Sequence, residues 1–189
     1  MADTAFRELE QASLIRPTYT DAVAPDAWVE ITESGRKALD RGALDSLDEA
    51  LLKISPGLAE LRAGAWAAVG SGLPDSLRQA AHSARELIDQ TLKAGAPDAA
   101  VISMPGFVKD SSSRSGITRR HRLRYLMAIY RADVSESTLE VAERACDLVL
   151  ATDSRFITLA HARTIPAASE IIESFRLAET ALRILLHAG

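Results

Sequence analysis

Apolar residues recur at steps of three and four along most of this chain. In the last such segment, Ile171, Phe175, Ala178, Leu182 and Leu185 follow one another at these steps. Residues with this spacing lie on one face of an α-helix and bury that face together. The same spacing is found in the segments that begin near residues 44, 58, 77, 118 and 135, and Ser135 is expected to cap the helix that it begins. The chain is therefore predicted to form an all-α bundle of about five helices.

The composition agrees with helices and disfavours several other classes. Alanine and leucine are abundant, whereas aromatic residues make up only 5% of the 189 residues, which argues against a β-sandwich or barrel. A hydrophobic share of 47% beside 25% charged residues argues against global disorder. No apolar run approaches the roughly 18 residues of a spanning helix, so no membrane association is expected. The start, MADTAFRELEQ, lacks the basic and apolar regions of a secretion signal, which predicts a cytoplasmic protein.

Motifs for several well-known chemistries are missing from the sequence. It contains no Gly-rich phosphate loop, no His-Glu-x-x-His and no Gly-x-Ser-x-Gly. The four histidines lie on separate segments without a second histidine at helical spacing, so neither a metal site nor a cofactor is expected. Cys146 is the only cysteine and has apolar neighbours, which predicts a small core residue rather than a catalytic thiol.

The first 42 residues have a different pattern and form the first of two predicted domains, 1–42 and 43–189. A short helix closed by Pro17, a turn-rich loop, a strand in AWVEIT and a helix with Ser34 as N-cap are expected in turn. The segments ELEQASLIRP and WVEITESGRKAL resemble the second half of a prokaryotic winged-helix domain. That resemblance implies a two-stranded wing and a closing helix. The N-terminal arm would then either pack on a protein surface or bind DNA.

The net charge of −4 is unevenly distributed. Seven basic residues and one acid lie between residues 109 and 132, which gives this segment +6 and leaves −10 for the rest. Arg119, Arg120, Arg122 and Arg124 fall at the start of the helix predicted here, with tyrosines interleaved further on. Arginines beside aromatic residues suit phosphate contacts and base stacking. These four arginines are therefore candidates for binding nucleic acid, with ion pairs to acidic helices as the alternative.

A polar stripe lies on the helix predicted after Pro74. Arg78, His82, Arg85 and Asp89 are spaced at i, i+4, i+7 and i+11, which places them on one helix face. This face is either solvated, with an internal ion pair, or the polar wall of a cleft. In the second case Arg78, His82 and Arg85 are the candidate cleft residues.

The segment DSRFITLAHART is predicted to be a junction closed by Pro166, and it holds Arg155-Phe-Ile-Thr-Leu-Ala-His161 just ahead of the final predicted helix. A helical bundle with an arginine, four to six residues and a histidine near the start of its last helix resembles the HEPN superfamily, in which many members are metal-independent ribonucleases. The same spacing also occurs from Arg114 to His121. The longer segments ISPGLAELRAGAWAAVGSGLPDSLRQAAHSARELIDQTLKAGAPD and TRRHRLRYLM resemble the HEPN-like predicted nucleases of bacterial defence loci, including those associated with PIWI proteins. This resemblance extends from about Leu44 to Ala188.

The resemblance implies that Arg155 and His161 are the catalytic pair and face a cleft at a homodimer interface. There the arginine would stabilise charge on the scissile phosphate, and the histidine would act as acid or base. The implied function is a metal-independent endoribonuclease or toxin-like effector of anti-phage defence, with RNA as substrate and a partner protein from the same system. The residue after the arginine is usually polar in active members, and Phe156 stands there. The alternatives are a catalytically inactive helical dimerisation module and a nucleic-acid-binding accessory protein.

Overall fold

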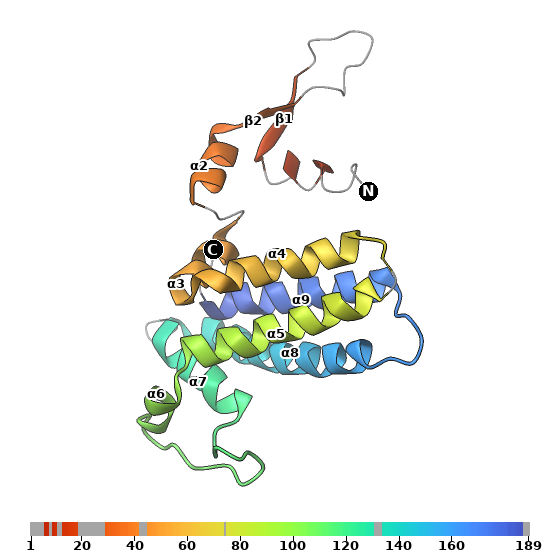
Figure 1. Ribbon diagram of the computed structural model, residues 1–189. Helices are drawn as coiled ribbons and strands as arrows, with labels where there is room; N and C mark the ends of the chain where they lie inside the picture. Colours follow the sequence, from red (N-terminus) through yellow and green to blue (C-terminus); the bar gives the residue numbers. More distant parts are fainter. Residues whose placement is uncertain are drawn as a thin grey trace. The chain divides into compact units, whose positions relative to one another are not determined.

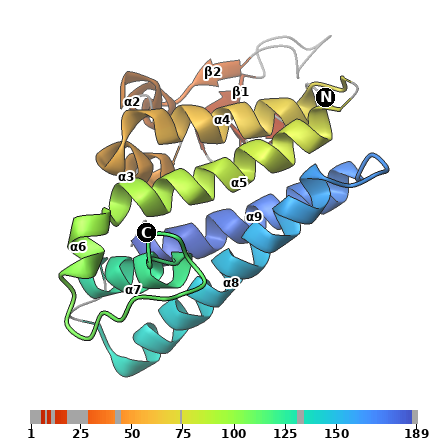
Figure 2. The ribbon, with the colours of Figure 1, turned by 60° about the horizontal axis from the view of Figure 1, so that its bottom comes forward.

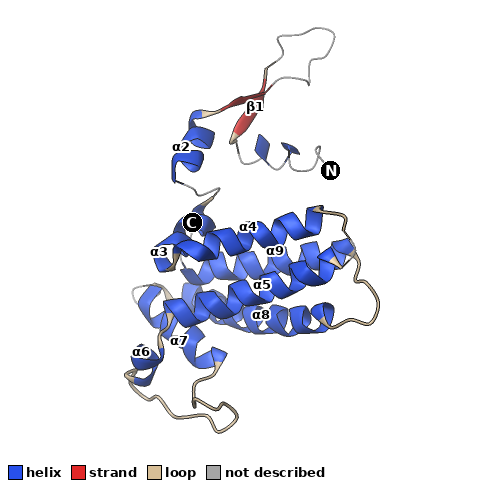
Figure 3. Ribbon diagram, viewed as in Figure 1, coloured by secondary structure: helices blue, strands red, loops and turns tan. Residues whose placement is uncertain are grey.

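Helices make up nearly all of the regular structure of this chain (Figure 3). The computed structural model describes residues 6–7, 9–10, 13–18, 29–41, 45–73, 75–130 and 134–186. Within these residues it contains eight helices and two short strands, divided between two compact units, Met1–Asp45 and Ser46–Gly189. The predicted all-α fold with a small N-terminal extension is confirmed.

The N-terminal unit contains a two-stranded antiparallel hairpin followed by a helix. Strand β1 (Ile15–Pro17) pairs with strand β2 (Val29–Ile31), and helix α2 (Glu33–Arg41) follows directly. This is the order of elements that the winged-helix resemblance implies. The turn-rich loop predicted before β2 lies mostly outside the described residues.

The first helix of this unit is shorter than predicted. Phe6, Arg7, Leu9 and Glu10 are helical, but Ser13 has a left-handed backbone with φ of 56°. A left-handed residue ends a helix. Residues 15–17, which were assigned to that helix, form β1 instead.

The start of α2 also differs from the prediction. Its cap is Thr32 rather than Ser34, because the Thr32 hydroxyl accepts the Gly35 backbone N–H at 3.0 Å. Gly35 packs tightly against the residue that precedes β1, since a Cβ at this position would lie 2.0 Å from the carbonyl oxygen of Leu14. Only glycine fits there, so hairpin and helix are closely joined.

Four long helices form the body of the second unit: α4 (Pro56–Gly70), α5 (Ser76–Gly95), α8 (Glu136–Ala160) and α9 (Ala168–Leu186). Helix α5 lies between α4 and α8 in both views (Figures 1 and 2), and α9 packs against α8. The α4–α5 and α8–α9 connections lie at the same end of the bundle (Figure 1). The shorter helices are α3 (Ser46–Ile54), α6 (Asp98–Ile102) and α7 (Arg119–Tyr130).

Helix α8 is longer than predicted. It begins as expected, with the Ser135 hydroxyl accepting the Thr138 backbone N–H at 3.3 Å, but it continues to Ala160 through a segment that was expected to be a junction. The reason is that Asp153 and Phe156 extend the buried face of the helix by two further turns. Arg155 therefore lies near the end of α8 rather than in a junction just ahead of the last helix.

The core of the bundle is aliphatic with a small aromatic cluster. Trp66 stacks on Phe175 with ring centroids 4.7 Å apart, and Phe156 meets Phe175 edge to face at 6.3 Å. Cys146 is a buried core residue, as predicted. Burial, together with the neighbouring Asp147 carboxylate, raises the pKa of its thiol to about 11. The reactive thiolate is therefore disfavoured.

A buried ion cluster joins α3, α4 and α9, and nothing in the sequence pattern indicated it. Arg62 is only 8% exposed. Its guanidinium donates to Asp48 at 2.8 Å and to Glu179 at 2.6 Å, and the Trp66 indole N–H donates to the same Glu179 oxygen at 2.8 Å. We call these four residues the structural cluster, because each short contact ties one helix to another.

Candidate functional site

A groove of about 560 Å³ lies where the end of α8 meets α4 and α5. Helix α5 contributes Arg78 and His82 to its lining, α8 ends in it at Ala160 and His161, and Glu60 and Ala68 of α4 complete the wall. His82 and His161 are both exposed. The groove therefore brings together two imidazole groups that are 79 positions apart in the sequence.

Arg78 holds the two sides of the groove together. Its Nε donates to the carbonyl oxygen of Ala162 at 3.0 Å and its Nη2 donates to that of Arg163 at 3.2 Å, while its Nη1 pairs with Asp75. These contacts fix the chain that follows His161 against the start of α5. Arg78 was predicted as a cleft residue, and it both lines the groove and braces it.

His161 is at the C-cap of α8. Its backbone N–H donates to the carbonyl oxygen of Ile157 at 3.2 Å and so completes the last helical turn. Its side chain is exposed in the groove. The other imidazole with the predicted spacing, His121, has a local role instead. Its Nδ1 accepts the Thr118 backbone N–H at 3.2 Å, and its ring lies edge-on to Phe107.

Arg155 points toward α9 and is not among the residues that line the groove. Its Nε donates to the Ser174 hydroxyl at 2.8 Å, and its Nη2 lies 3.5 Å from Glu170. About half of its side chain is exposed. The next residue, Phe156, is fully buried in the aromatic cluster. Within one chain, the predicted catalytic pair is thus divided between the groove and the α8–α9 surface.

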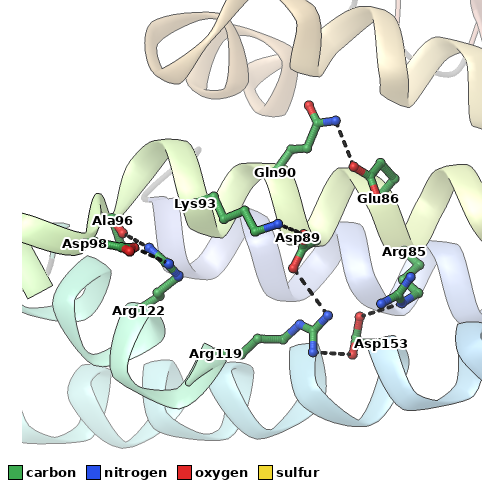
Figure 4. A network of polar contacts seen from close by, with 10 residues as sticks. All are labelled: Arg85, Glu86, Asp89, Gln90, Lys93, Ala96, Asp98, Arg119, Arg122 and Asp153. Carbon is green, nitrogen blue, oxygen red and sulfur yellow. Dashed lines mark hydrogen bonds and ion pairs between the residues drawn. The ribbon is translucent and has the colours of Figure 1, made fainter. Parts of the chain in front are cut away.

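Two members of the polar stripe of α5, Arg85 and Asp89, face α8 and α7 (Figure 4). Arg85 lies next to Asp153 of α8, with Nε and Oδ1 3.8 Å apart. Further along, Asp89 contacts Arg119 of α7 at 3.3 Å and Lys93 at 2.6 Å. Because the contacts from Arg78 to Arg85 run backwards along α8, the two helices are antiparallel neighbours.

Asp153 occupies the centre of this arrangement. Arg85 lies on one side of its carboxylate, and Arg119 lies on the other with Nη1 3.5 Å from Oδ2 (Figure 4). Asp153 is 4% exposed, and its Oδ1, like the buried Nε of each arginine, has no hydrogen-bond partner among the described residues. Burial raises the pKa of the Asp153 carboxyl, although Arg119 and Arg85 act in the opposite direction. We call Asp153, Arg85, Arg119, Asp89 and Lys93 the seam cluster.

The basic helix α7 is mostly occupied by contacts within the bundle. Arg120 pairs with Asp147 at 3.2 Å, and Arg122 pairs with Asp98 and also donates to the carbonyl oxygen of Ala96. Arg124 is exposed, and the described part of the chain provides no partner for it. The interleaved tyrosines pack against the core. Three of the four arginines predicted to bind nucleic acid therefore already have carboxylate partners.

Asp153 was missed by the sequence analysis, although a signal for it exists. It follows Val149 by four positions and precedes Phe156 by three, so it continues the inward stripe of α8. A carboxylate on such a stripe must be paired or must shift its pKa. Recognising that α8 reaches Ala160 would have identified it.

Neither a metal-binding cluster nor a membrane-spanning helix is found within the residues that the structure describes. No group of three His, Cys, Asp or Glu side chains there is placed to hold a metal ion. In the same residues, no helix is long and apolar enough to cross a bilayer.

Comparison with known proteins gives one match. A family model described as "Predicted pPIWI-associating nuclease" matches residues 51–185. The match begins in α3 and extends almost to the end of α9, so it includes both the groove and the seam cluster. No curated protein and no solved structure matches the chain.

Proposed function

We propose that this chain, which belongs to the family of predicted pPIWI-associating nucleases, is a metal-independent endoribonuclease of HEPN type that acts in the groove between α4, α5 and the end of α8. The observation that carries the proposal is the presence of two exposed imidazoles, His82 and His161, from different helices in one groove. Histidine can accept or donate a proton near neutral pH, so two of them can supply both a base and an acid.

In the proposed reaction, these two groups carry out both proton transfers. One imidazole accepts the proton of the ribose 2′-hydroxyl, and the 2′-oxygen attacks the adjacent phosphorus. The other, protonated imidazole donates its proton to the departing 5′-oxygen as the P–O5′ bond breaks. The products are a 2′,3′-cyclic phosphate and a 5′-hydroxyl. Because the 2′-hydroxyl is the nucleophile, DNA of the same sequence should be resistant.

Arg155 enters this proposal through a second copy of the chain. It is half-exposed on the α8–α9 surface, outside the groove, so a role at the scissile phosphate would require a partner subunit to bring it there. We therefore propose a homodimer with shared sites. If this is correct, mixing inactive Arg155→Ala and His161→Ala proteins should restore partial activity.

The central experiment is incubation of the purified protein with RNA in the presence and absence of EDTA. Cleavage should persist in EDTA, disappear with His161→Ala and fall strongly with His82→Ala. Thr164→Ala is the matched control, since Thr164 is exposed in the connection just after His161 and does not line the groove. Chelator-sensitive cleavage, or full activity in His161→Ala, would reject the assignment.

A second candidate function is a catalytically inactive helical module that binds a partner. It is favoured by the buried Phe156, which stands where active HEPN-like members usually have a polar residue. The partner named by the family description is a pPIWI protein. Co-purification of the two proteins, undiminished by His161→Ala and accompanied by no RNA cleavage, would support this alternative.

A further inference from the structure

We propose that Arg85 and Arg119 form a clamp for one backbone phosphate of the nucleic acid, and that the buried Asp153 positions both arginines for it. The inference rests on the proposed nuclease function, because it places the substrate backbone beside the groove. It assigns a role to the seam cluster that neither the chemistry in the groove nor the family match requires.

One carboxylate aligns two guanidinium groups from different helices. Arg85 on α5 and Arg119 on α7 lie on either side of Asp153 of α8, at 3.8 and 3.5 Å (Figure 4). Without the carboxylate, two like charges this close would repel each other and turn into solvent. Asp153 therefore holds them near one another.

Both arginines keep N–H donors that a ligand can use. A guanidinium has five N–H groups. Arg85 directs only its Nε toward Asp153, and no other contact is seen for it among the described residues. Arg119 uses one contact from each Nη. Each side chain remains 32% exposed although each Nε is buried, so solvent reaches other atoms of each side chain. Arginine pairs of this kind bind phosphate oxygens through charge-assisted hydrogen bonds.

The clamp lies close to the groove along α5. Arg85 follows His82 by three residues on α5, a rise of about 4.5 Å along the helix on nearly the same face. A phosphate bound at Arg85 would therefore be a near neighbour of the phosphate at the imidazoles. The charge of the seam cluster also suits a phosphate, because its three basic residues outnumber its two acids by one.

The contact geometry separates this role from a purely structural one. The ion pairs of Asp153 are longer than hydrogen bonds and leave buried polar atoms without partners. Such atoms cost folding free energy. A cluster selected for stability alone would have shorter and more complete contacts, as the structural cluster does.

The test is RNA binding by Asp153→Asn in EDTA, measured by fluorescence anisotropy of a labelled single strand over a range of salt concentrations. We make the variant in the His161→Ala chain so that the RNA stays intact. Kd should rise about tenfold, and the slope of log Kd against log salt should fall by about 0.7, the value for one lost phosphate contact on a single strand. Asp147→Asn is the matched control, since Asp147 also pairs α8 with an arginine of α7 but is exposed.

A direct variant covers the case in which Asp153→Asn does not fold. Arg85→Gln should produce the same loss of affinity and salt slope, while Arg144→Gln, an exposed arginine of α8, should change neither. If Asp153 acts through the arginines, the Asp153→Asn/Arg85→Gln double variant should bind little worse than Arg85→Gln alone. Wild-type affinity and salt slope in Arg85→Gln would overturn the clamp.

Binding and cleavage distinguish the two proposals. A chain that binds RNA through the clamp but never cleaves it would reject only the nuclease function. A chain that cleaves RNA normally in Arg85→Gln, with unchanged KM and kcat, would reject only the clamp. In an active enzyme the clamp predicts a raised KM with little change in kcat, because the contact lies beside the reacting phosphate.

Discussion

The two ion clusters of the bundle differ in charge balance and in construction. In the structural cluster, Arg62 is 8% exposed and its contacts to Asp48 and Glu179 are 2.6 to 2.8 Å long. In the seam cluster, the contacts of Asp153 are 3.5 and 3.8 Å long and its arginines are a third exposed. The first is closed, whereas the second holds donors ready for another anion. The difference indicates that burial of charge can serve either stability or binding within one fold.

The largest effect is expected from breaking the structural cluster. Arg62→Ala would leave the buried carboxylates of Asp48 and Glu179 without their shared cation. We expect a loss of about 3 to 5 kcal/mol in the free energy of unfolding. Urea denaturation followed by circular dichroism measures it. A loss below about 1 kcal/mol would contradict the structural role of this cluster.

A smaller effect on stability is expected from Asp153→Asn. Burial already disfavours the ionised carboxylate, and its loose ion pairs offset that cost only in part. The neutral amide should therefore change the unfolding free energy by about 1 kcal/mol or less while RNA binding weakens. Asp48→Asn provides the comparison within the structural cluster and should cost more. Equal destabilisation by the two variants would remove the distinction between the clusters.

The pH dependence of stability sharpens the same contrast. Burial raises the pKa of Asp153 above the ordinary value of 3.8, so the folded chain holds this proton more tightly than the unfolded chain. The stability from that protonation is present below the unfolded pKa and is lost as pH rises through the folded pKa. Wild type should therefore lose stability relative to Asp153→Asn over the acidic range above about pH 4. A constant difference over this range would contradict the raised pKa.

The smallest effect is expected from the exposed pair of Arg120 and Asp147. Both side chains are more than half exposed, so solvent and salt screen their attraction. Asp147→Asn should change the unfolding free energy by about 0.5 kcal/mol or less. Denaturation at low and high salt should give nearly the same result for this variant. A loss comparable to that of Arg62→Ala would show that exposure does not distinguish this pair from the structural cluster.

Much of the bundle was predictable because helices are encoded locally. The stripe from Ile171 to Leu185 is buried as expected, and Ser135 caps α8 as its hydroxyl suggested. The α5 stripe was also recognised, and Arg78 and His82 line a groove as one of its two interpretations proposed. These features depend on neighbours within one or two turns, which the sequence displays directly.

The errors arose where a local signal competed with a longer-range contact. The composition of the segment up to Pro17 is compatible with a helix. Pairing with β2 nevertheless makes its last three residues a strand. The segment after Thr152 contains polar residues that suggested a junction, but Phe156 packing on Phe175 keeps it helical. In both cases tertiary contacts outweighed weak local preference.

The sequence by itself predicted the helical class and the division into an N-terminal hairpin unit and a helical bundle. It also displayed each polar motif separately. Only the tertiary structure decided which motifs meet. His82 joins His161 rather than Arg155, and Arg119 joins Arg85 around Asp153. The physical reason is that helical periodicity specifies which face of a helix is buried, whereas the partner of that face depends on how whole helices pack.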